Sequence, residues 1–518
     1  MTGRAGIGRA GIGGRATSAV ICVAVVAGSV AMGAQEASAQ PCPTVRPTDP
    51  SGGFIHYDDP LNVTFYDPPL GEVRVWYATA GTHAPVLTPV GPSGAPANVE
   101  VVGEVMEDAF LRFGDLGFGE PRRDGAYDAC ASNGGDGRLD VYLVDFASGA
   151  DGAASVEVCN GSPVQTCSGF MLLDHRYNGY ASFRAGVEIV GPHELFHLIQ
   201  YAYDANIERW WAEGTAQWAT KQLYPESKDL EAFLPFFFDE PGRSLDAPPG
   251  GATVGWLYAT AIWPTFLAET EGPDVVREVL EAMAQSPQTS LEATQEVLAR
   301  TGGNLPASYL NFAAYNAATG QRASAGGYPD GATYPEVALV EVAAGHGVLV
   351  DDRLAGFGAS YYLSREPRSV RLEADPARAT AVALPFEGDT LDPTTAIPLP
   401  ADLTGPAVIV VAGQSSSKVD ALYQLVSEPI SDGSGGAGAG GGGAAPSPSD
   451  DDDDEGDPGG CTVAAPGLSH GGPHPSPGAW RWVMLTLLGA SMVNRPLRRR
   501  RHRRRRSTAP SVRRPEGR

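Results

Sequence analysis

The sequence predicts an α+β fold in which a mixed helix-and-strand domain, residues 40–330, precedes a small all-β sandwich, residues 331–428. Two observations predict the first domain: strand-like alternation at 54–79 and 138–146, and helical spacing of apolar residues between 226 and 320. The third observation is the change of pattern that follows, where short runs of Val, Leu and Tyr are broken by Gly, Asp and Pro. Such runs at regular spacing are typical of a β-sandwich.

The strands and the first helix follow from local patterns. The runs "FIHYDD" (54–59) and "EVRVWYAT" (72–79) predict two strands, and "RLDVYLVDF" (138–146) predicts a third. Residues 98–118 have apolar side chains at helical spacing and end at a glycine, which predicts an amphipathic helix. The later helices are expected at 229–238, 255–270, 274–285, 290–302 and 305–320, and the later strands at 338–352, 359–365, 369–375, 380–386, 407–414 and 421–428.

Two segments outside these domains are not expected to fold. Residues 1–39 combine arginines, an apolar run and a small-residue end, which is the order of a secretory signal peptide cleaved after Ala39. Residues 429–460 are rich in Gly, Ala, Pro, Ser and Asp, a composition that predicts a flexible, disordered linker. The folded part is therefore expected to be exported.

The C-terminal end contains Cys461, a short apolar segment at 482–493 and an arginine cluster that ends at residue 506. The apolar segment is shorter than the roughly 20 residues that a membrane-spanning helix needs. The order of these features resembles the myxobacterial C-terminal sorting tag (461–506), followed by a disordered tail (507–518). The resemblance implies processing near Cys461 by sorting machinery and presentation at the cell surface, associated with the outer membrane, or secretion. The alternative is a weak membrane anchor with a positive cytoplasmic flank.

Charge excludes one class of partner. The formal net charge is -24, although the arginine-rich end is positive, so the body of the chain is more acidic still. An acidic body repels nucleic acid, and the arginine cluster is interpreted as a topology and sorting signal. Contact with a membrane is expected only through the C-terminal tag.

Cysteine usage agrees with export. Four cysteines remain when the signal peptide and Cys461 are set aside, and an even number suits an oxidising compartment. Cys159 and Cys167 enclose a turn-rich loop that a disulfide can close, which leaves Cys42 to pair with Cys130 by elimination. Four cysteines allow three connectivities, so the sequence alone does not fix this pairing.

An acidic loop precedes the predicted strand at 138–146. The cluster "DACASNGGDG" supplies Asp136, and Asp140 follows within the strand, so these two carboxylates are candidate calcium ligands. The spacing differs from the twelve-residue helix-loop-helix pattern, and clusters of Asp, Asn and Gly are also typical of ordinary turns. Both interpretations stay open.

The motif "HELFH" carries the strongest chemical signal. His193 and His197 are four residues apart, so a helix places both imidazoles on one face, where they can bind one zinc ion. Glu194 then lies beside the metal as a general base for zinc-polarised water. Pro192 suits the first turn of a helix that begins near Gly191. The alternative is a core helix with two ordinary buried histidines.

A catalytic zinc site needs a third protein ligand and an open position. Gln200 and Tyr203 stand where a metzincin has Gly and His, which excludes that class. The next segment, "ERWWAEGTAQW", offers Glu208 and Glu213, and Glu213 is favoured because it lies among tryptophans and alanines, where a buried carboxylate needs a cation. The alternative is an ion pair of Glu213 with Arg209 or Lys221. Gln217, one turn later, is a candidate hydrogen-bond partner of a ligand.

Four motifs in order carry a family resemblance: "HYD" (56–58), "GGDGRLDVYLVD" (134–145), "HELFHLIQYAYD" (193–204) and "WWAEGTAQW" (210–218). They resemble the gluzincin class of zinc metallopeptidases, and more closely a family of secreted bacterial zinc metalloproteases. The resemblance implies a zincin-like metallopeptidase domain at 40–330, with zinc on His193, His197 and Glu213 and with Glu194 as base.

The implied function is an exported, surface-tethered zinc peptidase that hydrolyses the peptide bonds of a polypeptide substrate. Such a reaction needs a donor for the tetrahedral oxyanion, and Tyr258 is the candidate, with His175 and Tyr203 in reserve. Tyr258 can also be read as an ordinary aromatic of a helix core. The alternative function is a non-catalytic surface adhesin with a structural or vestigial zinc site, but structural zinc has no use for a base at Glu194.

Overall fold

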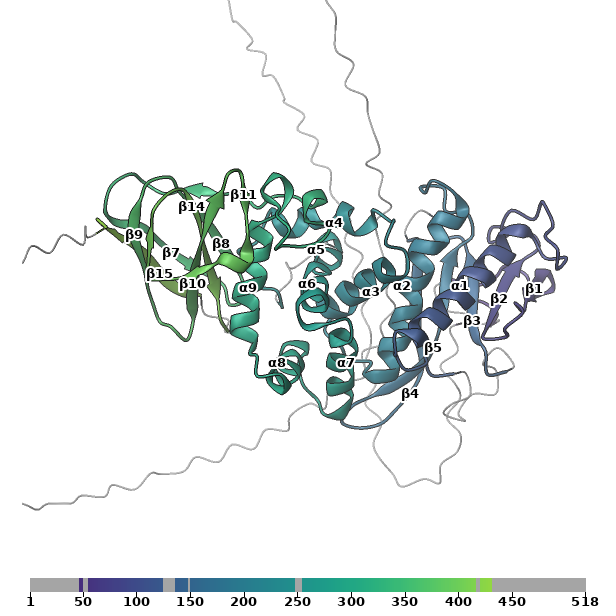
Figure 1. Ribbon diagram of the computed structural model, residues 1–518. Coiled ribbons are helices and arrows are strands. Elements are labelled where there is room, and N and C mark those ends of the chain that lie inside the picture. Colours follow the sequence, from purple (N-terminus) through teal and green to yellow (C-terminus); the bar gives the residue numbers. More distant parts are fainter. Residues whose placement is uncertain are drawn as a thin grey trace, which may run out of the picture. The chain divides into compact units, whose positions relative to one another are not determined.

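The computed structural model describes residues 46–49, 55–123, 136–147, 150–246, 254–415 and 420–430 (Figure 1). Helices and mixed sheets form an α+β fold, which confirms the predicted fold class. The expected signal peptide, sorting tag and tail lie outside the described residues, as do the linker after residue 430 and Cys42, Cys130 and Cys461.

The first sheet has five strands in the order β1-β2-β3-β5-β4. Strands β2, β3 and β5 are parallel to one another, whereas β1 and β4 run antiparallel to their neighbours. The strand β4 therefore lies at one end of the sheet. The bounds are β1 Val63–Tyr66, β2 Val73–Ala78, β3 Leu139–Val144, β4 Gly152–Asn160 and β5 Thr166–Asp174.

The two faces of this sheet belong to different cores. Helices α1 (Ala97–Asp115) and α2 (Phe183–Tyr203) pack on each other and on one face, where Val141 and Leu143 of β3 join the main core (Figure 1). The alternate residues Tyr142 and Val144 lie on the other face in a smaller aromatic core. This alternation is what a pleated strand buried on both sides requires.

The helix that carries HELFH begins earlier than the sequence predicts. The start near Pro192 is wrong, because α2 begins at Phe183 and Pro192 lies inside it. Ser182 is the N-cap and its side chain accepts a hydrogen bond from the backbone N–H of Ala185. A proline inside a helix removes one backbone hydrogen bond, and tertiary packing of this buried helix outweighs that loss. Gly191 brings α1 close, since a Cβ there would lie 2.8 Å from the Met106 sulfur.

The remaining helices follow the predicted patterns, except that the single helix expected at 255–270 is interrupted at residues 260–261 and forms two, α5 and α6. None of the helices within the described segments combines the length and apolar character that crossing a membrane requires. Their bounds are α3 Arg209–Leu223, α4 Asp229–Phe238, α5 Val254–Ala259, α6 Ile262–Glu271, α7 Val275–Gln285, α8 Ser290–Arg300 and α9 Leu305–Ala317.

Two further sheets follow α9. One has the order β11-β10-β14-β8-β6, with β12 paired to β10, and the other has the order β13-β9-β15-β7. They share a core that includes Ile409, Val411 and Leu425. The bounds are β6 Val340–Glu341, β7 Gly347–Leu354, β8 Ala359–Ser364, β9 Arg368–Ala374, β10 Ala379–Glu387, β11 Thr390–Leu391, β12 Ile397–Pro398, β13 Ala401–Leu403, β14 Ala407–Gly413 and β15 Ala421–Glu428.

Strand β14 is buried on both of its faces. Ile409 and Val411 point into the core between the two sheets, whereas Val408 and Val410 join the main core together with α9, which packs on β14 and β10. This explains why "AVIVVAG" is a continuous apolar run and does not alternate with polar residues.

The predicted strands differ from the structure in three places. The run at 338–352 forms two strands in different sheets, β6 and β7, in place of one. "FIHYDD" (54–59) contains no strand among its described residues, because Asp59 caps a short 3-10 helix at Pro60–Asn62 and β1 begins only at Val63. The hairpin of β4 and β5 was not predicted, since only its connecting loop carries a clear turn signal.

Candidate metal centre

Three buried side chains from two helices meet at one point. His193 and His197 project from α2, and Glu213 projects from α3. The Nε2 atoms of His193 and His197 lie 3.3 Å and 3.5 Å from the same oxygen, Oε2 of Glu213. Among the described residues, these three form the one group of His, Cys, Asp or Glu whose geometry could hold a metal ion.

The three donor atoms all lie within 4.8 Å of one another, and the two separations from Glu213 are close to those around a tetrahedral zinc ion. Donors that each lie about 2.0 to 2.1 Å from one ion at tetrahedral angles are roughly 3.3 to 3.4 Å apart. The two measured separations match this value. Two imidazole nitrogens and one carboxylate oxygen are also the ligand types of catalytic zinc sites, which keep a fourth position open.

The electrostatics show how strongly Glu213 depends on positive charge beside it. Burial alone would raise the pKa of Glu213, but the hydrogen bonds from His193 and His197 outweigh burial and hold its pKa well below the usual range. Burial lowers the pKa of His193. Burial opposes the charged form of His197 as well, yet the bond to Glu213 and the carboxylates of Glu213 and Glu194 raise its pKa to about 9. Without a metal, the buried carboxylate of Glu213 favours a proton on the His197 ring. A divalent cation can replace the charge of that proton.

Glu194 lies beside the cluster and faces the edge strand. It is 3% exposed, and burial raises the pKa of its carboxyl group to about 7, while a hydrogen bond with the backbone of Ala154 acts in the opposite direction. Its side chain fills the space above Gly152 of β4, where a Cβ would lie 2.9 Å from both Cγ and Oε1 of Glu194. The predicted base therefore lies between the His193–His197–Glu213 cluster and β4.

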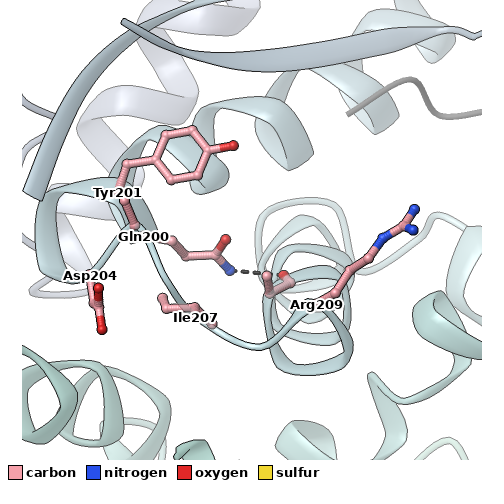
Figure 2. Close-up of a pocket in the computed structure, with 7 residues that line it drawn as sticks. Gln200, Tyr201, Asp204, Ile207 and Arg209 are labelled. Atoms are coloured by element: carbon pink, nitrogen blue, oxygen red, sulfur yellow. Dashed lines mark hydrogen bonds between the residues drawn. The ribbon is translucent and has the colours of Figure 1, made fainter. Parts of the chain in front are cut away.

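Gln200 and Thr215 support the proposed ligand His197 through hydrogen bonds, and the sequence did not predict this role for either residue. Gln200 accepts a hydrogen bond from Nδ1 of His197 at 2.8 Å, and its amide nitrogen donates to the carbonyl of Ala212 at 2.8 Å and to Oγ1 of Thr215 at 2.7 Å. Figure 2 shows the side chain of Gln200 extending from α2 toward α3 beside a small pocket, which Tyr201 also lines. The available signal was the spacing, because Gln200 lies one turn after His197 on the same helix.

Gln217 has a contact of the kind that was predicted. It hydrogen-bonds to His193, and its amide nitrogen donates to Asp229 at 2.6 Å. Burial raises the pKa of Asp229, a residue that the sequence reading did not connect with the site. Asp229 begins α4, so its connection with Gln217 depends on how that helix packs against α3.

The structure brings one of the three candidate oxyanion donors to the site. The ring of Tyr258 lies 5.3 Å from that of His193 and also contacts Phe233. The hydroxyl of Tyr203 instead accepts a hydrogen bond from the backbone of Gly119, which occupies it at the end of α2. His175 follows β5, and burial lowers its pKa.

Of the alternatives that the sequence left open, Glu208 and Lys221 have other partners, whereas Arg209 contacts Glu213. Glu208 accepts hydrogen bonds from the backbone N–H of Ser290, the first residue of α8. Lys221 pairs with Glu231 and so does not serve as the partner of Glu213. Arg209 does form an ion pair with Glu213, with its Nε 3.7 Å from Oε1, while Oε2 faces the two histidines.

The two calcium candidates are each paired with arginines. Asp136 pairs with Arg138 and Arg74, and Asp140 pairs with Arg46 and accepts a bond from the indole of Trp76. The arginines already balance both carboxylates, so the calcium interpretation gains no support from the described residues.

The disulfide between Cys159 and Cys167 is confirmed. The two residues face each other across β4 and β5. Their bond closes the hairpin whose edge strand packs against Glu194.

Comparison with protein-family models and with curated proteins finds no match for this chain.

Proposed function

We propose that this chain is a zinc-dependent peptidase with a zincin-like domain, in which His193, His197 and Glu213 hold the metal and Glu194 is the general base. The observation that carries the proposal is the pair of 3.3 Å and 3.5 Å separations from Glu213 to two buried imidazoles, with a buried acid next in sequence to the first. A structural zinc site would need the ligands but has no use for Glu194, which disfavours the adhesin alternative.

When bound, zinc supplies a Lewis acid that polarises a water molecule and the carbonyl of the scissile bond. The chain supplies the proton transfers. Glu194 takes a proton from the attacking water and returns it to the leaving amine, and a carboxyl group whose pKa is raised to about 7 is suited to both steps near neutral pH. Tyr258, next to His193, is proposed as the donor to the developing oxyanion.

Strand β4 suits an extended peptide as the substrate. It is the last strand in the order of its sheet, so one of its two edges has no strand beside it in the described segments. An extended peptide can add to such an edge through backbone hydrogen bonds. Because Glu194 packs on Gly152 of the same strand, a peptide bound along β4 would pass beside the base.

Export to the cell surface is part of the proposal. A disulfide between Cys159 and Cys167 is typical of oxidising compartments. Mass spectrometry of protein recovered from the native host should give a mature N-terminus after Ala39 and a C-terminus near Cys461. Recovery of the intact chain from the cytoplasm would contradict this.

The direct test combines metal content with hydrolysis of a peptide library by the full chain. Wild type should contain one zinc per chain and cleave peptides. Glu194→Gln should keep the zinc and lose about 10²- to 10⁴-fold in kcat, the usual contribution of a general base. Glu213→Ala should lose the zinc. Substitution of the exposed Glu226 by Gln is the control and should change neither quantity. Full activity in Glu194→Gln, or a wild type without zinc, would refute the proposal.

A further inference from the structure

We propose that Gln200 and Thr215 are positioning residues that fix the protonation of the His197 ring, so that its Nε2 lone pair points to the metal. The inference rests on the proposed function and goes beyond it, because neither residue is a ligand, a base or a substrate contact. Both are fully enclosed, with Gln200 1% and Thr215 0% exposed.

Counting donors and acceptors determines the orientation of each group. The hydroxyl hydrogen of Thr215 goes to a backbone carbonyl of its own helix, that of Trp211 at 2.7 Å. Its oxygen is then free to accept from the Gln200 amide. The second amide hydrogen of Gln200 goes to the carbonyl of Ala212, which can only accept. Both hydrogens are used, so the amide oxygen must face His197.

The orientation of Gln200 determines the state of the imidazole. An amide oxygen has no hydrogen to give, so Nδ1 of His197 must carry the hydrogen in the 2.8 Å bond. When Nδ1 is protonated, a neutral ring has its lone pair on Nε2, the atom that lies 3.5 Å from Glu213. If the Gln200 amide turned over, its NH₂ group would face Nδ1 and favour the opposite tautomer.

The same amide also connects two of the proposed ligands. The carbonyl of Ala212 belongs to the residue before Glu213, so one side chain of α2 holds both the His197 ring and the backbone next to Glu213. Thr215 lies on the next turn of α3 and accepts the other hydrogen of the Gln200 amide, so Gln200 and Thr215 together form a clamp between the two helices. The clamp therefore fixes the distance between a nitrogen ligand and the oxygen ligand as well as the tautomer.

The test compares two threonines of one helix. Thr220 is buried and donates to the carbonyl four residues earlier, as Thr215 does, but the described contacts of Thr220 include no glutamine. In the full chain, zinc affinity is measured by competition with a chelator. Gln200→Met should weaken affinity by about 10- to 100-fold, the usual effect of losing the hydrogen-bond partner of a ligand. Thr215→Val should weaken it in the same direction, whereas Thr215→Ser, which keeps the hydroxyl, and Thr220→Val should stay within about twofold of wild type.

A second readout separates positioning from stability. In the zinc-loaded protein, the Nδ1 proton of His197 should give a slowly exchanging NMR signal in wild type and in Thr220→Val. The signal should shift or be lost by exchange in Thr215→Val. Thermal unfolding of the metal-free variants shows whether the two valine substitutions destabilise the fold equally. If Gln200→Met does not fold, the comparison of Thr215→Val, Thr215→Ser and Thr220→Val decides the question.

The outcomes distinguish this inference from the proposed function. A wild type that binds zinc, together with Gln200→Met and Thr215→Val variants that bind it equally well and keep the ring signal, would overturn the inference and leave the peptidase proposal intact. A wild type that binds no zinc would overturn both.

Discussion

Gly152 has a functional role because it has no side chain. A Cβ at this position would lie 2.4 Å from Val190 and 2.9 Å from the Glu194 side chain, closer than such atoms approach in proteins. The glycine thus allows β4 to lie directly against the base, and any larger residue would displace the carboxylate from its place beside the proposed zinc ligands.

Gly152→Ala should therefore impair catalysis without removing the metal. A displacement of about 1 Å can reduce a rate by roughly 100-fold, so kcat should fall by about that factor while zinc content stays at the wild-type level. Gly405→Ala is the control, because a Cβ there has nothing within 4 Å. Steady-state kinetics with elemental analysis measures both effects, and a normal kcat in Gly152→Ala would show that Glu194 tolerates displacement.

At the level of single residues, the sequence predicted the site residues whose spacing lies within one helix. His193, Glu194 and His197 lie on two adjacent turns of one helix, and helical spacing alone predicts that the two histidines share a face. The Glu213 prediction used its apolar neighbours, which indicate burial. The partners of Gln200 and Gly152 lie on another helix and another strand, so no pattern within either segment reveals them.

Among the elements, the β4–β5 hairpin is the one that the catalytic proposal needs and the sequence reading missed. Residues 152–156 of β4 are small or only moderately apolar, and a register shift between Val156 and Cys159 breaks the regular alternation. The helices α4, α7, α8 and α9 lie within a few residues of their predicted limits, and α7 has strong amphipathic periodicity, whereas the helix predicted at 255–270 is divided into α5 and α6. Regular periodicity, more than length, separates the elements that could be predicted from those that could not.

The disulfide should contribute measurably to the stability of this hairpin. Cys159 and Cys167 are eight residues apart, and a loop of that size corresponds to about 2.5 kcal/mol of chain entropy. Replacing both with Ser should lower the free energy of unfolding by roughly this amount and reduce peptidase activity, because β4 supports Glu194. Denaturant unfolding of the double variant measures the change; an unchanged midpoint would mean that the strand pairing alone holds the hairpin.

In the molecule as a whole, the segment 46–49 is joined to the five-stranded sheet by a buried arginine. Arg46 is 1% exposed, and its guanidinium group makes two 2.6 Å contacts with Glu157 and a further ion pair with Asp140. It also donates to the hydroxyl of Tyr142 and lies over the ring of Phe170. These partners are about a hundred residues away in sequence, so the contact closes a long loop of the chain.

Arg46→Met should therefore be strongly destabilising. It leaves two carboxylates buried without their cation, and breaking a buried ion pair in this way costs about 3 to 5 kcal/mol. Arg371→Met is the matched control, because Arg371 also pairs with two carboxylates but lies in solvent, where such pairs contribute little to stability. Equal losses of unfolding free energy in the two variants would show that burial adds nothing to the Arg46 contacts.

The double burial of β14 has a consequence for how the protein unfolds. Its odd and even residues belong to two cores, and one of these cores continues through α9 to the helices that carry the proposed ligands. Melting the sheet that contains β14 and β10 would remove the apolar face on which α9 packs, and melting the helices would expose Val408 and Val410. Unfolding of these layers is therefore coupled, and heat or denaturant should produce one cooperative transition in which the C-terminal sheets and the metal centre are lost together.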